Sequence, residues 1–240
     1  TGGRMFKLTS YEMPEAGRTA KGTAIVNLLQ LDGGEKVTTV IPVDEDQGGN
    51  LVMATKNGLI KKTALSEFRN LRASGLIAVT LREDDELIGV TLTDGSRELL
   101  LGTRQGMSIR FNEDDVRTMG RTAMGVRSID LAPEDEVVSM SAVQEGCEVL
   151  TISENGYGKR TPEAEYRVQS RGGKGIKAMQ LTDKTGPLSA LMLVREDEDV
   201  MLISDDGTII RMAVADISTQ SRSTQGVRLM RLADSSRVVA

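Results

Sequence analysis

The chain has 240 residues, of which 39% are hydrophobic, with a formal net charge of −5 at pH 7, one cysteine and no histidine. The absence of histidine excludes Ser-His-Asp and Cys-His catalysis and histidine-ligated zinc, and the single Cys147 excludes an internal disulfide. No apolar run reaches the ~18 residues that a membrane span needs, and no Walker A or GxGxxG pattern occurs. We therefore expect no catalytic residue, no cofactor and no metal site.

In chain order, the sequence divides into five similar segments, and we expect one structural repeat from each. Four of them contain a run of strand-forming residues, then a polar-glycine turn, then a second short run, which is the pattern of a β-hairpin. In the last segment, for example, 200–204 precedes Gly207-Thr-Ile-Ile-Arg-Met. The approximate repeats are 1–47, 48–95, 96–145, 146–197 and 198–240.

Each hairpin is followed by further strand signals. An alternating segment such as Ile176-Lys-Ala-Met-Gln-Leu, an acidic turn such as 83–86 and another short run such as 87–90 come next. About four strands for every ~50 residues is typical of a propeller blade. The predicted fold class is all-β, with about five four-stranded repeats in one propeller-like domain.

Two series of glycines recur at intervals of about 50 residues and mark the repeat. The first series is Gly3, Gly58, Gly106, Gly156 and Gly207. The second series is Gly22, Gly75, Gly125, Gly175 and Gly226. Two apolar series keep the same phase, and periodic apolar positions indicate core packing. They are Met13, Phe68, Val116, Tyr166 and Ile217, and Leu28, Leu81, Leu131, Leu181 and Leu232.

The net negative charge hides an alternation of sign along the chain. The windows 1–22, 55–75, 103–127, 153–177 and 204–228 hold 23 of the 30 basic residues and 12 of the 35 acidic ones. In a radial fold, equal phase means equal radius, so the basic windows should converge on one band. Such a band attracts the phosphates of duplex DNA without reading bases. The acidic runs between the windows are interpreted as solvated turns.

Basic side chains also keep phase within these windows, and we predict that they contact DNA. Four residues after the first glycine stand Lys7, Lys62, Arg110, Arg160 and Arg211, with Lys61 and Lys159 beside two of them. Four before the second glycine stand Arg18, Arg121, Arg171 and Arg222, with Arg72 beside the exception, Leu71. Two after the second glycine stand Arg127, Lys177 and Arg228, whereas Ala24 and Ile77 break the pattern. Lys21 and Arg167 complete the predicted set.

The densest basic motif is the heptapeptide Gln169-Ser170-Arg171-Gly172-Gly173-Lys174-Gly175. Glycines let backbone N–H groups approach an anion closely. With Lys177 two residues beyond, this motif is predicted to be the strongest single phosphate patch.

This heptapeptide resembles the box QRRGGKG that is the hallmark of the C-terminal domain of the DNA gyrase A protein. The stretches EMPEAGRTAKGTAIVNLL, NGLIKKTALSEF, LREDDELIGVTLTDG, ENGYGKRTPEAEYRVQSRGGKGIK and STQGVRL also resemble that family, so the resemblance covers the whole chain. Two departures stand out. Ser170 replaces one arginine of the box, and five repeats are present where the family has six blades, so a first blade is expected to be missing.

The resemblance implies a β-pinwheel with strands exchanged between blades, whose edge wraps duplex DNA with positive handedness and so supports negative supercoiling by ATP-dependent gyrase. It implies that the breakage tyrosine and the ATPase lie outside this chain. The implied partners are DNA, the rest of the dimeric gyrase A protein and the gyrase B protein in the bacterial cytoplasm, with no membrane and with a monomeric fragment.

Three alternatives stay open. The first is the C-terminal domain of the corresponding protein of topoisomerase IV, which shares the blade. The second is a propeller that serves as a protein-interaction scaffold, since fold does not determine function. The third, an enzyme with a central active site, is disfavoured by the missing histidine and metal-ligand clusters.

Overall fold

The predicted hairpins form the centre of the sheets in the computed structural model, which describes residues 2–44, 47–72 and 74–240. Three of them have two six-residue strands each. They are β2 (Asn50–Thr55) with β3 (Leu59–Ala64), β6 (Glu98–Thr103) with β7 (Met107–Asn112), and β10 (Glu148–Ser153) with β11 (Tyr157–Pro162). A fourth, β14 (Asp199–Ile203) with β15 (Ile209–Ala213), has five-residue strands.

Each complete four-stranded sheet contains strands from two repeats, in the orders β5-β2-β3-β8, β9-β6-β7-β12 and β13-β10-β11-β16. The inner strands come from the same repeat as the hairpin. They are β5 (Leu87–Thr93), β9 (Val137–Ala142) and β13 (Leu188–Val194). The outer strands come from the following repeat. They are β8 (Val126–Arg127), β12 (Ile176–Lys177) and β16 (Val227–Arg228).

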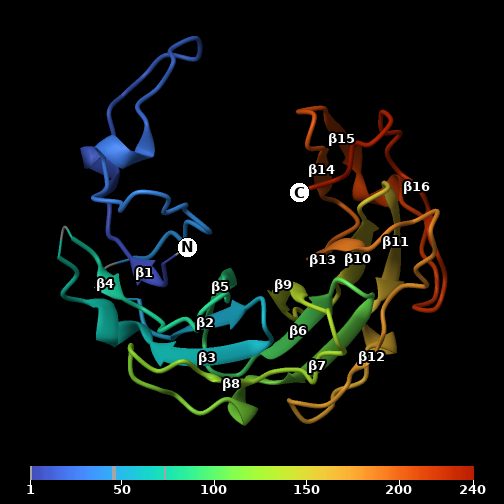
Figure 1. Ribbon diagram of the computed structural model, residues 1–240, viewed down its shortest axis with the longest axis horizontal. Helices are drawn as coiled ribbons and strands as arrows, with labels where there is room; N and C mark the ends of the chain where they lie inside the picture. The colour runs from blue at the N-terminus through green and yellow to red at the C-terminus, as the bar shows by residue number, and fades with distance from the viewer. Residues whose placement is uncertain (1, 45–46, 73) are drawn as a thin grey trace.

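We call each sheet a blade, numbered by the repeat of its hairpin, so these three sheets are blades 2, 3 and 4. The segment that runs from a hairpin to the outer strand of the preceding blade is called a crossover. Crossovers 3, 4 and 5 are residues 113–127, 163–177 and 214–228. Successive blades follow an arc, with the outer strands along its convex side (Figure 1).

In repeats 3, 4 and 5, the glycine of the second series marks the point where a crossover touches the preceding blade. Gly175 has φ of +74°, and a Cβ there would clash with the carbonyl oxygen of Ser108 on β7. Gly226 has φ of +75°, and a Cβ would lie 2.5 Å from the carbonyl oxygen of Gly158 on β11. Only glycine combines this backbone conformation with so close an approach. The regular spacing of these glycines therefore reflects strand exchange.

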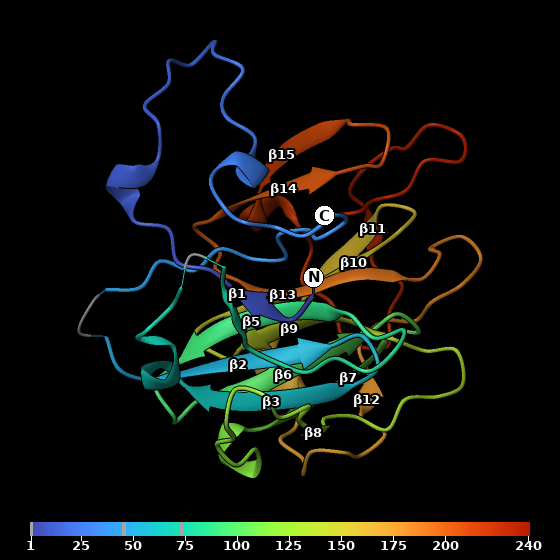
Figure 2. The same ribbon diagram turned by 60° about the vertical axis from the view of Figure 1, so that its left-hand side comes forward.

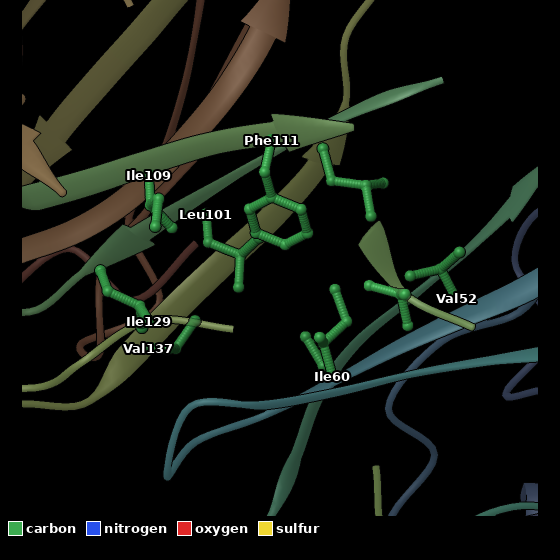
Figure 3. Close-up of a cluster of buried hydrophobic side chains, with 10 residues drawn as sticks. Val52, Ile60, Leu101, Ile109, Phe111, Ile129 and Val137 are labelled. Atoms are coloured by element: carbon green, nitrogen blue, oxygen red, sulfur yellow. The ribbon is translucent and has the colours of Figure 1, made fainter. Parts of the chain in front are cut away.

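The hydrophobic core lies between successive blades. Val52 and Ile60 of blade 2 pack against Leu101, Ile109 and Phe111 of blade 3, as Figure 3 shows. Similar clusters join blades 3 and 4, and blades 4 and 5. Burial confirms four of the five residues in the first predicted apolar series, which are Phe68, Val116, Tyr166 and Ile217. The five leucines of the second series are partly buried.

The two end repeats depart from the four-stranded expectation. In repeat 1, β1 (Arg4–Met5) pairs only with β4 (Leu76–Ile77), and the described residues between β1 and β2 contain no strand. Without a sheet beneath it, Met13 is 54% exposed, so its predicted burial is wrong. Part of the segment between β1 and β2 loops away from the arc of blades in both views (Figures 1 and 2), and Ile41 near its end packs against the core cluster of blade 2. Blade 5 has β14, β15 and a single bridge from Ser204 to Val238, with no outer strand among the described residues.

Helical structure in the described part of the chain is limited to single 3-10 turns. These are η1 (Ser10–Glu12), η2 (Ile25–Asn27), η3 (Leu65–Phe68), η4 (Glu113–Asp115), η5 (Glu163–Glu165) and η6 (Val214–Asp216). None of the described helices is long and apolar enough to cross a membrane. The turns η4, η5 and η6 each open a crossover, and they come directly after β7, β11 and β15.

Candidate nucleic-acid interface

The outer strands place one exposed cation on each of three successive blades. Arg127 ends β8, Lys177 ends β12 and Arg228 ends β16. All three side chains are exposed, and their strands lie on the convex side of the arc (Figure 1). Because each strand is supplied by the following repeat, these cations sit at the junctions between blades.

Two arginines of the crossovers form hydrogen bonds to the backbone of these outer strands. Arg171 donates from Nη1 to the carbonyl oxygen of Arg127 at 3.0 Å, and from Nε to that of Asp115 at 2.8 Å. Arg222 repeats the contact one blade further on, with Nη1 donating to the carbonyl oxygen of Lys177 at 2.7 Å. Each arginine thus fixes the backbone that carries the neighbouring exposed cation. We call Arg127, Arg171, Lys174, Lys177, Arg222 and Arg228 the basic arc.

The heptapeptide 169–175 forms the middle of crossover 4 and is anchored by its backbone. Gln169 N–H donates to the carbonyl oxygen of Arg110 at 2.7 Å, Gly172 N–H donates to that of Ser128 at 2.6 Å, and the Gly173 carbonyl accepts from Asp130 N–H at 2.9 Å. Lys174 is exposed and makes no hydrogen bond or ion pair with the described residues. The glycines therefore carry the attachment, and the Lys174 ammonium stays available to an anion.

Five predicted contact residues point inward, so their predicted exposure is corrected. Lys61 and Lys159 are fully buried. Lys61 Nζ donates to the carbonyl oxygens of Ala78 and Arg121, and Lys159 Nζ donates to those of Ser221 and Arg222 at 2.5 Å each. Burial lowers the pKa of both lysines to about 8.

The other three bind the 3-10 turn that opens the next crossover. Lys62 Nζ donates to the carbonyl oxygen of Glu113 at 2.9 Å, and Arg160 Nε donates to that of Ile217 at 2.7 Å. Arg110 pairs with Glu98 and Glu163 and donates to the Tyr166 carbonyl at 3.2 Å. Strands β3, β7 and β11 are covered by both the outer strand and the crossover, so their basic side chains face protein and not solvent.

The remaining predicted cations lie on the surface at scattered places. Arg211 on β15 is 72% exposed and pairs with Asp199. Arg121 is partly exposed in crossover 3. The exposed others are Lys7, Arg18 and Lys21 in the N-terminal segment, Arg72 after η3, and Arg167 in crossover 4. Arg117 was missed by the sequence analysis, although it is exposed in crossover 3 at the phase of Arg167.

The acidic turns are more than solvated charge. The buried Asp85 carboxylate accepts the Asn57 N–H at 2.9 Å, and Asp135 accepts the Gln105 N–H at 2.9 Å. Each carboxylate thereby holds the glycine turn of its own hairpin. Within the described ranges, no three His, Cys, Asp or Glu side chains gather as a metal site would require.

Comparisons with known proteins agree with this architecture. The family model described as DNA gyrase C-terminal domain, beta-propeller, matches residues 1–44, 49–94, 97–144, 148–195 and 198–240. The DNA gyrase A protein of Halalkalibacterium halodurans is 60% identical over 98% of this chain and 28% of its own length. The same protein of Salmonella typhimurium is 46% identical over 99% of this chain and 27% of its own length. The chain thus spans less than a third of these relatives.

Two solved structures share the fold. The C-terminal domain of DNA topoisomerase IV superposes with a TM-score of 0.91 at 26% identity, covering 99% of this chain and 75% of the other. A DNA gyrase A C-terminal domain superposes with a TM-score of 0.87 at 24% identity, covering 100% and 78%. The curated relatives at 46–60% identity are gyrase A proteins. By its matched repeats and these relatives, the chain belongs to the DNA gyrase C-terminal domain family.

Proposed function

We propose that this domain binds duplex DNA without sequence preference along the basic arc and wraps it around the convex side of the blades. The observation that carries the proposal is the placement of Arg127, Lys177 and Arg228 on the outer strands of three successive blades. A line of exposed cations neutralises phosphates and releases counterions, which requires no contact with bases.

The curvature of the arc gives this binding a mechanical consequence. A duplex that follows the outer strands must bend, and smooth bending by 40–90° over 20–30 base pairs costs roughly 1–6 kcal/mol. Several phosphate contacts offset such a cost, as they do where histones wrap DNA. Duplex is favoured over single-stranded DNA because four of the six aromatic residues, Phe68, Phe111, Tyr157 and Tyr166, are buried, and the exposed Tyr11 lies in the N-terminal segment and not on the basic arc.

Within a complete gyrase, we propose that the wrap has the handedness that negative supercoiling requires, with the rest of the gyrase A protein and the gyrase B protein as partners in the bacterial cytoplasm. Catalysis would then reside outside this chain. The alternative assignment to topoisomerase IV predicts the same surface chemistry. What separates the two is whether the bound DNA acquires a fixed handedness.

The test is a linking-number measurement on the 240-residue chain. Nicked circular duplex is incubated with the protein and sealed with ligase, the protein is removed, and the supercoils are counted. We expect positive supercoils that increase with protein and decrease with salt. A chain that binds the duplex but leaves its linking number unchanged would disprove wrapping, and a chain that does not bind at all would disprove DNA binding too. The double variant Arg127→Ala/Lys174→Ala serves as the matched negative control.

A further inference from the structure

The outer edge of blade 4 differs from those of blades 2 and 3 by an aromatic ring between two cations. Tyr157 opens β11 and is only 6% exposed. Its hydroxyl oxygen accepts from Arg228 Nη2 at 2.8 Å and from Nε at 3.2 Å. The guanidinium carbon of Arg228 lies 5.4 Å from the ring centroid, and Lys184 Nζ lies 5.3 Å from the same centroid. One side chain therefore contacts both cations.

The equivalent cations on the other blades have different partners. Arg127 pairs with Asp130, three residues ahead, at 3.3 Å, and Lys177 donates to Gln180, also three ahead, at 2.8 Å. Three residues ahead of Arg228 stands Arg231, which cannot accept a hydrogen bond from it. The neutral hydroxyl of Tyr157 accepts the hydrogen bonds of Arg228. The guanidinium is therefore fixed in position while its positive charge is not neutralised by a carboxylate.

Lys184 is a second position at which repeat 4 differs from repeats 2 and 3. Nine residues after the second glycine, repeats 2 and 3 carry Asp84 and Glu134 in their acidic turns, whereas repeat 4 carries Lys184. Lys184 is exposed, and its backbone carbonyl accepts from Asn155 Nδ2 at 3.1 Å, which fixes the turn. Blade 4 therefore has a second cation, Lys184, where blades 2 and 3 have a carboxylate, in addition to the outer-strand cation that all three blades share.

We propose that Arg228 and Lys184 form a phosphate clamp at the outer edge of blade 4, and that Tyr157 is the positioning residue that holds both cations. The ligand is the phosphodiester backbone of the duplex, so this inference rests on the proposed function. Both cations lie within 5.4 Å of one ring centroid, which places them within reach of a short stretch of one strand. Cation–π contacts and a charge-assisted hydrogen bond stabilise this arrangement before DNA arrives.

The first test measures duplex affinity across a salt series for single variants. Arg228→Ala and Lys184→Ala should each weaken binding about 3- to 10-fold and lower the salt slope by ~1. Tyr157→Leu should weaken binding about 2- to 5-fold, because it leaves both cations without their support. In an Arg228→Ala/Lys184→Ala background, Tyr157→Leu should have no further effect, since it acts only through them.

The chain offers matched controls for these variants. Leu59 occupies the position of Tyr157 in blade 2, so leucine is compatible with this strand. Met107→Leu makes a parallel change on blade 3 and should leave affinity unchanged. Arg237→Ala removes an exposed cation that pairs with Asp205, away from the outer strands, and should also have no effect. Circular dichroism melts establish that each variant is folded.

A second readout is specific to the clamp. Hydrogen bonding from Arg228 lowers the pKa of the Tyr157 hydroxyl, and the charge of Lys184 adds to this. A phosphate bound to the two cations would offset their charge and raise that pKa again, which tyrosine ring-carbon NMR can follow with and without duplex. A tyrosine that had only a packing role would not shift.

The outcomes separate this inference from the proposed function. If Arg228→Ala weakens binding but Tyr157→Leu matches wild type, Tyr157 does not position the clamp. If Arg228→Ala and Lys184→Ala bind like wild type while Lys174→Ala is weakened, the clamp is refuted and Arg228 is removed from the proposed path, but duplex binding along the rest of the basic arc stands. If wild type itself fails to bind duplex, both the function and the clamp are refuted.

Discussion

Crossovers 4 and 5 occupy equivalent places on neighbouring blades and share an arginine contact and two backbone hydrogen bonds, yet one attachment differs between them. Crossover 5 is held by a buried ammonium, because Lys159 Nζ donates to the carbonyl oxygens of Ser221 and Arg222 at 2.5 Å each. At the matching place beneath crossover 4 stands Ile109, which is fully buried and apolar. In place of the lysine bonds, crossover 4 has a hydrogen bond from Gly172 N–H to the carbonyl oxygen of Ser128 at 2.6 Å.

This difference explains what the heptapeptide contributes. Where a lysine attaches the crossover to the blade, that lysine is buried. Its ammonium group is hydrogen-bonded within the protein and cannot contact DNA. Where the backbone of Gly172 makes the attachment, Lys174 remains exposed without a hydrogen bond or ion pair to the described residues. The basic residues that recur with the repeat therefore divide into those that hold the fold together and those that can face a phosphate. Variants of each kind test this division.

The largest effect should come from Lys159→Ala. The variant leaves a cavity and two carbonyl oxygens without their donor, at a cost of about 2–4 kcal/mol in the free energy of unfolding. Urea denaturation measures this. Lys174→Ala is the matched control, and as an exposed substitution it should stay within about 0.5 kcal/mol of wild type. Equal stabilities for the two variants would contradict the division.

Gly175→Ala should be next in size. Alanine is strained at φ of +74°, and its Cβ would clash with the Ser108 carbonyl. We expect a loss of about 1–3 kcal/mol in the free energy of unfolding, with weaker pairing of β12. Gly120→Ala, where a Cβ meets nothing within 4 Å, should be nearly neutral. Hydrogen exchange of the β12 amides locates the damage.

Lys174→Ala should separate affinity from stability. Duplex binding should weaken about 3- to 10-fold on all sequences alike, with a salt slope reduced by ~1 and an unchanged melting temperature. Fluorescence anisotropy on two duplexes of different sequence provides the measurement. A change of sequence preference with an unchanged slope would show that Lys174 contacts bases and not phosphate.

The smallest effect is a dependence of stability on alkaline pH. The pKa of Lys159 is about 8 in the folded state and near 10.5 when unfolded, so between these values the unfolded chain binds more protons. Stability contributed by this group should therefore rise as pH increases from 8 towards 10.5. Urea midpoints measured at about pH 8 and about pH 9.5 cover most of this rise in stability. The change in midpoint between the two pH values is then compared between wild type and Lys159→Ala. The rise should be smaller in Lys159→Ala, and an identical rise in the two proteins would refute the shift.

Much of the architecture was accessible from the sequence because the repeat is local. The glycine turns at Gly58, Gly106, Gly156 and Gly207 predicted hairpins that the structure confirms. Burial of Phe68, Val116 and Tyr166 followed from their phase, and burial holds the pKa of Tyr166 above its usual range. The predicted burial of Met13 is wrong because burial at this position requires a preceding blade. The position of a residue within the repeat does not show whether that blade is present.

The all-β class, the five repeats, their period and the windows in which basic residues gather could all be predicted from the sequence. Which of these basic residues face outward depends on the packing of the blades. Lys159 and Lys177 belong to the same repeat and the same basic window, yet one is buried and the other exposed. The physical reason is that exposure depends on what covers a strand. Here the cover is an outer strand and a crossover supplied by the next repeat, about 50 to 70 residues further along the chain.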